Sequence, residues 1–265
     1  SYIPPSAWAW RKGRAKSCAA LADEIVAIFP HELPPYEAAG ANISFVGNPL
    51  IDTVRAEMEP EEARRHFGIE ENDVPILLMP GSRREEIERL LPPMLGAAEI
   101  LQTRDPARRF FLPVAGGVDE QRIEEHLAAS PVEVTLTHDA RYALMKAARA
   151  AIAASGTVVM ETAVMGLPAV VLYRMSALSY FVGRLLVDVP RFSLPNILLG
   201  ETFETELLQG AVQPERIAAA MEPIIADGEA RSYVTERLAR AVEMLGEPHA
   251  ARRVAEKIIA LGRRV

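Results

Sequence analysis

Short apolar runs alternate with amphipathic helical stretches along most of this chain. The runs have the length of strands, and the stretches between them combine helical periodicity with turn residues at their ends. Strands separated by helices pair in parallel through βαβ crossovers. The alternation therefore predicts an α/β fold with a doubly wound parallel sheet. The expected strands are 25–29, 43–46, 76–79, 110–114, 132–136, 151–154 and 169–173.

Helices are expected between these strands and beyond the last one. Pro92 and Pro93 fall inside one expected helix, and they should kink or restart it because proline lacks the N–H donor. After Tyr173 the pattern becomes mostly helical. The expected helices are 12–21, 31–39, 60–67, 85–101, 120–129, 140–148, 157–165, 177–187, a short one from Ile197, 214–226, 229–245 and 250–261.

The sequence divides into two unequal parts. Gly47, Asn48 and Pro49 break the pattern after the second expected strand, and a linker follows at 52–60. We expect residues 1–52 to complete a first lobe with part of a sheet, and residues 53–265 to form the remainder. The first residue is not methionine, and 2–5 resembles the inside of a protein, so we expect an N-terminally incomplete chain.

Charge and cysteine content exclude several classes of function. The net charge is −7 and the pI is about 5.4, which argues against a general affinity for nucleic acid because phosphate neutralisation needs a basic surface. Cys18 is the one cysteine, so an internal disulfide and a cysteine metal cluster are both excluded. The sequence also has no apolar run of bilayer length and no signal peptide. A cytosolic location is the default expectation.

A turn at 80–86 follows the third expected strand and opens a helix. Gly81 lets the backbone approach a ligand closely, Ser82 offers a hydroxyl, and Arg83 supplies a fork of donors suited to a diphosphate. Free N–H groups and the positive end of a helix favour an anion at this place. An ordinary helix cap with solvated charges explains this turn about equally well.

A second turn of this kind begins at Ser155. Ser155, Gly156 and Thr157 provide two hydroxyls and a flexible backbone, and Glu161 follows one helical turn later. A carboxylate there can accept two hydrogen bonds from the cis-diol of a ribose. A Ser or Thr cap with a capping-box glutamate also fits the spacing, but it does not explain the small residues at 153–156. Together the two turns favour a nucleotide or nucleotide-sugar ligand.

Three further features are weaker. Asn196 follows a rigid Ser-Leu-Pro segment and could bond a phosphate or sugar hydroxyl, although turn chemistry alone explains it. Arg174 ends the strand after the second turn, on the expected ligand side. The segment 8–16 combines tryptophans with basic residues and could touch anionic lipid or a phosphorylated sugar, or simply form a solvated helix face.

Several common motifs are missing from the sequence. The five histidines are scattered and there is no Asp-x-Asp pair, so a metal site is not expected. The sequence has no Walker A lysine turn, no G-x-S-x-G elbow and no G-x-G-x-x-G fingerprint. The last absence lowers the expectation of a dinucleotide dehydrogenase.

Taken together, these residues resemble the lipid-A-disaccharide synthase family. Each segment is weakly specific alone, but the set runs in family order over nearly the whole chain. The matching segments are 5–11, 45–50, 80–87, 154–157 with Glu161, 166–168, 193–196 and 206–209.

The resemblance implies two Rossmann-like lobes of GT-B type facing across a cleft. Residues 1–52 would be the C-terminal part of the acceptor-side lobe, and residues 53–265 the UDP-sugar donor-binding lobe plus C-terminal helices. The family's first half-domain, on the order of 100 residues, has no counterpart before Ser1. No catalytic base is therefore named, and we expect the fragment alone to be inactive.

The resemblance also implies the reaction. Family members are inverting glycosyltransferases of Gram-negative lipid A biosynthesis, which move a 2,3-diacylglucosamine from UDP to 2,3-diacylglucosamine 1-phosphate without a metal or other cofactor. Both substrates carry acyl chains, so we expect a cytoplasmic protein peripheral to the inner face of the inner membrane. The implied donor-binding residues are Gly81, Ser82, Arg83, Ser155, Gly156, Thr157, Glu161, Arg174, Asn196 and Glu206.

Two alternatives stay open at this point. One is another UDP-sugar enzyme of the same architecture, such as a peptidoglycan-precursor transferase or a UDP-sugar 2-epimerase. The Trp-Ala-Trp-Arg and Ser-Leu-Pro-Asn segments argue against it. The other is a UDP-binding fragment without turnover. The family commonly has histidine where Asn48 stands, and an arginine near Glu201 is missing, so these positions depart from the family pattern.

Overall fold

The computed structural model describes residues 1–7, 13–176 and 190–263. Contacts divide the chain into two compact units. The first combines Ser1–Thr53 with Arg240–Val265 and with 178–190, which lies almost wholly outside the described ranges. The second combines Val54–Ala177 with Arg191–Ala239. The acceptor-side and donor-side roles expected for the two lobes stay predictions.

The first unit contains a small parallel sheet. β1 (Ile25–Ala27) pairs with β2 (Ile43–Phe45), with Ile25 opposite Ile43. Tyr36 is fully buried in its core and donates a hydrogen bond to the Pro5 carbonyl at 2.8 Å. The helical segments are α1 (Gly13–Leu21), η1 (Pro30–Glu32), α2 (Leu33–Glu37), α3 (Leu50–Thr53) and α13 (Ala250–Gly262).

Asp52 ties α13 to residues near the start of the chain. Its carboxylate accepts hydrogen bonds from the backbone N–H groups of His249 at 2.7 Å and Ala250 at 3.1 Å. A carboxylate at a helix N-terminus satisfies free N–H groups and is favoured by the helix dipole. Arg253 in the same helix donates to the Val46 carbonyl at 2.7 Å. These bonds explain why the C-terminal helix belongs to the first unit.

The second unit contains a six-stranded sheet. Its order is β5-β4-β3-β6-β7-β8, and every neighbouring pair is parallel. The sequence therefore predicted the fold class correctly: α/β, with a doubly wound parallel sheet. The strands are β3 (Val74–Met79), β4 (Arg108–Pro113), β5 (Val134–Thr137), β6 (Ala150–Ala154), β7 (Ala169–Tyr173) and β8 (Glu206–Leu208).

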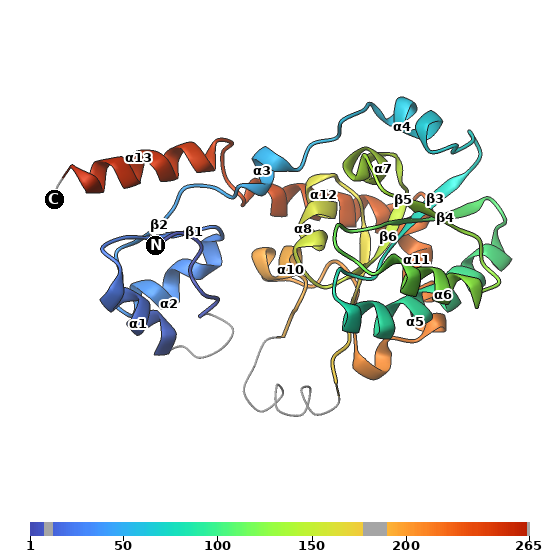
Figure 1. Cartoon of the computed structure of the whole chain (residues 1–265), viewed down its shortest axis with the longest axis horizontal. Helices are drawn as coiled ribbons and strands as arrows, with labels where there is room; N and C mark the ends of the chain where they lie inside the picture. Colours follow the sequence, from blue (N-terminus) through green and yellow to red (C-terminus); the bar gives the residue numbers. More distant parts are fainter. Residues whose placement is uncertain (8–12, 177–189, 264–265) are drawn as a thin grey trace. The chain divides into compact units, whose positions relative to one another are not determined.

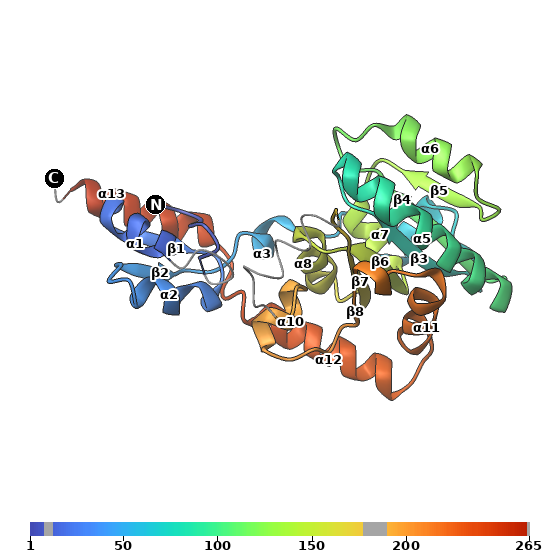
Figure 2. The same ribbon diagram turned by 90° about the horizontal axis from the view of Figure 1, so that it is seen from below.

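Helices cover both faces of this sheet (Figures 1 and 2). α4 (Pro60–His66), α7 (Arg141–Ala147) and α8 (Thr157–Val164) cover one face. Leu77, Met79, Ala151 and Ala153 alternate along β3 and β6 and belong to the apolar core of that face, as the two-residue period of a strand requires.

The opposite face is covered by another group of helices. α5 (Arg84–Arg104) packs beside α11 (Pro214–Ile225) and α6 (Glu120–Ala128). The remaining segments are α10 (Leu194–Leu199), which packs against α8, η2 (Gln209–Ala211), and α12 (Glu229–Glu243), which begins in the second unit and ends in the first. Within the described ranges, no helix is both long and apolar enough to span a membrane.

The structure differs from the expected elements in at least two respects. α5 continues through Pro92 and Pro93 without a restart, because Leu90, Leu91, Met94 and Leu95 are buried on both sides of the prolines and hold the helix together. β8 was not expected at all, since its three residues have no alternation of their own. The expected helix at 177–187 and the tryptophan-containing residues 8–12 lie outside the described ranges.

Candidate functional site

The two turns lie at the carboxyl ends of neighbouring strands. β3 ends at Met79 and β6 at Ala154, and Met79 is opposite Ala153 in the register. After β3 the chain adds β4 and β5 on one side of the sheet, and after β6 it adds β7 and β8 on the other side. The direction of strand addition therefore reverses between β3 and β6, which is the topological switch point of the sheet. Open α/β sheets bind ligands at this point.

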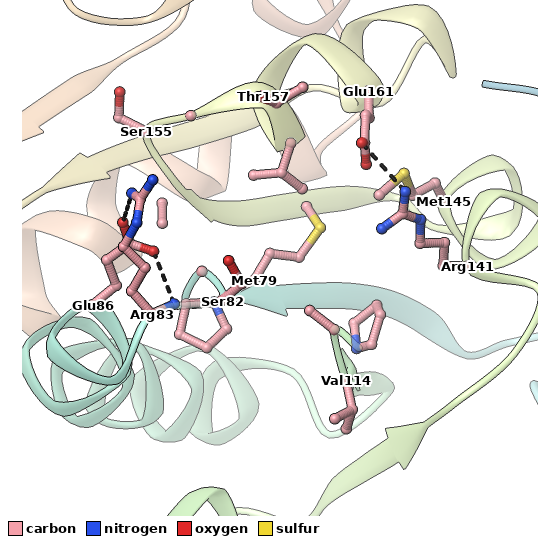
Figure 3. Close-up of a pocket in the computed structure, with 17 residues that line it drawn as sticks. Met79, Ser82, Arg83, Glu86, Val114, Arg141, Met145, Ser155, Thr157 and Glu161 are labelled. Atoms are coloured by element: carbon pink, nitrogen blue, oxygen red, sulfur yellow. Dashed lines mark hydrogen bonds and ion pairs between the residues drawn. The ribbon is translucent and has the colours of Figure 1, made fainter. Parts of the chain in front are cut away.

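A cavity of about 310 Å³ opens there, and both turns line it (Figure 3). Seven of the ten predicted donor-binding residues therefore share one pocket. That this pocket binds UDP stays a prediction. The lining residues are Met79, Pro80, Gly81, Ser82, Arg83, Glu86, Pro113, Val114, Ala115, Arg141, Met145, Ala154, Ser155, Gly156, Thr157, Val158 and Glu161.

Gly81 is required by the backbone of the first turn. Its φ is +100°, a conformation that side chains with a Cβ rarely adopt, and an added Cβ would clash with the carboxylate of Glu86. That carboxylate accepts the Arg83 N–H at 3.3 Å and the Arg83 guanidinium at 2.7 Å. The first turn thus caps α5 and still leaves the Arg83 side chain 82% exposed at the cavity.

The second turn opens α8 without a side-chain cap among the described residues. Gly156 stands at the cap position, and the Ser155 hydroxyl donates instead to the Phe192 carbonyl at 3.0 Å. Glu161 is the fifth residue of α8, beyond the position of a capping-box partner. The capping-box alternative for this turn is therefore wrong. The Ser155 N–H donates to the Leu172 carbonyl at 2.8 Å, and Gly156 and Thr157 line the cavity beside it.

Glu161 lies at the far end of the cavity from Arg83 (Figure 3). Its side chain is 11% exposed, and Oε1 forms an ion pair with Arg141 at 3.3 Å. Oε2 is buried and has no hydrogen-bond partner within the described ranges. Burial raises the pKa of Glu161, and the charge of Arg141 opposes that rise. The carboxylate therefore has unused capacity to accept hydrogen bonds.

The prediction from sequence missed Arg141. This residue begins α7, after β5, and Ala140 before it adopts a left-handed conformation with φ of +44°. The guanidinium also contacts the Tyr142 hydroxyl at 2.5 Å and lies 4.6 Å from the centre of that ring. A signal was available, because Arg141 lies in the first turn of the expected helix 140–148, which follows the expected strand 132–136.

Arg174, Asn196 and Glu206 do not line this cavity. Asn196 is fully buried, and its side chain bonds the backbone of Phe203 and Glu204 and the carboxylate of Glu206. This network fixes the segment before α10 rather than presenting Asn196 to the pocket.

Glu206 and Arg174 also interact with the backbone. Glu206 accepts the N–H groups of Phe192 and Ser193 at 3.0 and 2.9 Å. Arg174 is exposed and approaches the carbonyl of Arg89 at 3.5 Å. Pro93 cannot donate to that carbonyl as an ordinary helical residue would, so Arg174 compensates for the proline. Neither arrangement places the side chain in the pocket.

Comparison with known proteins identifies relatives over nearly the whole chain. The family model described as lipid-A-disaccharide synthetase matches residues 1–259. A protein from Syntrophus aciditrophicus named lipid-A-disaccharide synthase is 43% identical over 98% of this chain and 68% of its own length. A protein of that name from Geobacter metallireducens is 41% identical with the same two coverages.

Solved structures share the fold at low sequence identity. A UDP-GlcNAc 2-epimerase from Neisseria meningitidis bound to UDP-GlcNAc has a TM-score of 0.65 and 16% identity, covering 91% of this chain and 62% of that one. Anabaena HepE in complex with UDP-glucose has a TM-score of 0.56 and 14% identity, covering 94% and 68%. The family match and the identity to curated relatives show that this chain belongs to the lipid-A-disaccharide synthetase family.

Proposed function

We propose that the protein is a lipid-A-disaccharide synthase. It moves a 2,3-diacylglucosamine from UDP to 2,3-diacylglucosamine 1-phosphate and releases UDP. Family membership supports this activity over that of the epimerases, whose likeness to the chain is one of fold at 16% identity. The observation that carries the ligand class is the single cavity at the switch point of the sheet, lined by both turns and by Glu161.

The cavity offers separate partners for the two ends of UDP. Gly81, Ser82 and Arg83 on one side, with Gly156 and Thr157 on the other, would bind the diphosphate through backbone N–H groups, hydroxyls and a guanidinium. Ser155 would shape this turn, because its N–H and hydroxyl already donate to the Leu172 and Phe192 carbonyls. Glu161 would accept the ribose hydroxyls. Negative charge develops on UDP as it leaves the sugar. The N-terminal ends of α5 and α8, together with Arg83, would stabilise that charge.

The remaining predicted donor residues have an indirect place in this proposal. Glu206 accepts the N–H groups of Phe192 and Ser193, and Asn196 donates to the same carboxylate. The Phe192 carbonyl in turn accepts the Ser155 hydroxyl. Asn196 and Glu206 would therefore stabilise the second turn indirectly, through the segment that bonds Ser155. Arg174 would act only through α5, because it approaches the Arg89 carbonyl in that helix.

Family membership also supports a proposal for the two lobes and for the location. We propose that the second unit binds the UDP-sugar donor and that residues 1–52 belong to the acceptor-side lobe. Both substrates carry acyl chains, so the protein would work at the inner face of the inner membrane as a peripheral protein.

A thermal-shift screen with UDP, UDP-N-acetylglucosamine, NAD and ATP tests the ligand class on the purified chain. We expect selective stabilisation by the uridine compounds, because a ligand that binds the folded state raises its stability. Equal or greater stabilisation by NAD or ATP would contradict the proposal. A second assay incubates the chain with UDP-N-acetylglucosamine alone, and formation of its epimer would favour an epimerase instead.

A further inference from the structure

Arg141 occupies a position that its own backbone and neighbours define closely. The left-handed Ala140 turns the chain into α7, and the first residue of that helix is Arg141. Its Nη2 meets both the Tyr142 hydroxyl at 2.5 Å and Glu161 Oε1 at 3.3 Å. Figure 3 shows the guanidinium directed toward the carboxylate of Glu161 at the end of the cavity remote from Arg83. The guanidinium is thus anchored on one side by an aromatic residue and aimed at Glu161 on the other.

Glu161 depends on this partner. The residue is 8% exposed overall, and a buried carboxyl group favours its neutral form. In the neutral form, one of its oxygens becomes a hydroxyl donor, and the group can no longer accept hydrogen bonds through both oxygens. Accepting two ribose hydroxyls therefore requires the ionised carboxylate, which a nearby positive charge favours.

We propose that Arg141 is a positioning residue for the nucleotide: it holds the Glu161 carboxylate ionised and oriented to accept the two hydroxyls of the ribose. The inference rests on the proposed function, since it assumes that UDP occupies this cavity. On this proposal, Glu161 distinguishes ribose from deoxyribose by direct contact, and Arg141 makes that distinction possible by acting on Glu161.

Few other charges face this carboxylate among the described residues. Tyr142 lies beside Arg141 on α7, and Glu57, from the segment before α4, acts on Arg141. Arg83 and Glu86 line the cavity at the start of α5 and are paired with each other at 2.7 Å. Arg141 is therefore the cation whose removal should change the charge state of Glu161.

The test compares the affinities of the full chain for UDP and 2′-deoxy-UDP by calorimetric titration. Wild type should bind UDP at least about tenfold more tightly, as expected for a hydrogen bond to a charged group. In Arg141→Met and Arg141→Gln, this ratio should fall to within about twofold near pH 7 and rise again as the pH is raised, because burial without the Arg141 charge shifts ionisation of the carboxyl group to higher pH. Arg141→Lys keeps the charge and should keep the ratio.

The affinity ratio separates a positioning role from other effects. Protonation of the diphosphate changes the affinities for UDP and 2′-deoxy-UDP equally, so it cancels in their ratio. Two neutral variants are used so that the test still stands if one of them does not fold. Arg122→Met is the matched control, because Arg122 pairs with Glu88 and Asp119 at 2.9 Å outside the cavity and should leave the ratio unchanged. Glu161→Gln keeps a hydrogen-bonding group but has no charge, so it should weaken the preference and make it independent of pH.

Two results would overturn the inference while the proposed function stands. One is a wild-type ratio in both neutral Arg141 variants at every pH. The other is a reduced ratio that high pH does not restore, which would indicate a structural role for Arg141. If wild type does not bind UDP, the proposed function itself fails.

Discussion

Gly81 and Gly156 both bring backbone to the cavity, but their conformations differ. Gly81 has φ of +100° and has the Glu86 side chain where a Cβ would be. Gly156 has φ of 166°, which is extended backbone, and no atom lies within 4 Å of the place of its Cβ. The first glycine is therefore required by the fold, whereas the second leaves open space for a ligand. Arg83 lies beside the first glycine and adds the charge.

Alanine at each glycine gives a matched pair of variants. Gly81→Ala should lower the free energy of unfolding by about 1–3 kcal/mol, because the left-handed backbone is strained and Glu86 must move. Gly156→Ala should change it by less than about 0.5 kcal/mol, yet weaken UDP binding by filling space in the cavity. Denaturant unfolding and UDP titration measure the two effects. Equal losses of stability in both variants would contradict this account of the turns.

Arg83→Ala should weaken UDP binding by roughly 1.5–3 kcal/mol, the contribution of a hydrogen bond to a charged group. The guanidinium is 82% exposed, so its loss should have little effect on the fold. Arg84→Ala removes the neighbouring charge, which is exposed and does not line the cavity, and serves as the control. Calorimetric titration that finds the same UDP affinity in wild type and Arg83→Ala would refute the role assigned to the first turn.

At the scale of elements, a buried polar network joins β8 to the start of α10. Glu204 is 1% exposed and accepts the Ser193 hydroxyl at 3.0 Å, while Glu206 and Asn196 bond the adjoining backbone. Burial raises the pKa of Glu204 to about 8, so its carboxyl group is mostly protonated at neutral pH. The network thus stabilises the segment that receives the Ser155 hydroxyl.

Glu204→Gln should remove part of the pH dependence of stability. An acid whose folded pKa exceeds its unfolded value stabilises the fold at low pH. That contribution falls as the pH rises from the unfolded pKa of about 4.3 toward about 8, because the unfolded chain has already lost the proton. The variant should therefore show a flatter decline of Tm across this range. An identical decline in wild type and variant would show that Glu204 is not the group responsible.

α5 shows where helix propensity was insufficient as a guide. Proline favours a break at 92–93, yet buried leucines and Met94 span the site and Arg174 approaches the freed Arg89 carbonyl. Tertiary packing provides more stabilisation than the two lost backbone bonds cost. These contacts join residues far apart in the chain, so the local pattern could not predict them.

At the scale of the whole molecule, the alternation of strands and helices predicted the parallel sheet, and the strand ends predicted which turns would meet. The pairing of β3 with β6 brings the two turns together, and glycine and serine at strand ends were visible in the sequence. Arg141 was missed because its place depends on the left-handed Ala140. The internal bonding of the buried Asn196 and the half-buried Glu206 was missed because β8 is defined by pairing with β7 rather than by its own pattern.

Amide hydrogen exchange with and without saturating UDP tests most directly whether the two turns bind one diphosphate. Ligand binding should slow exchange in peptides that cover 80–86 and 154–161 together, because both sets of N–H groups would be bonded to phosphate or closed to water. Peptides covering β1 and β2 in the first unit should not change. Protection of one turn without the other, or protection confined to the first unit, would contradict the shared site.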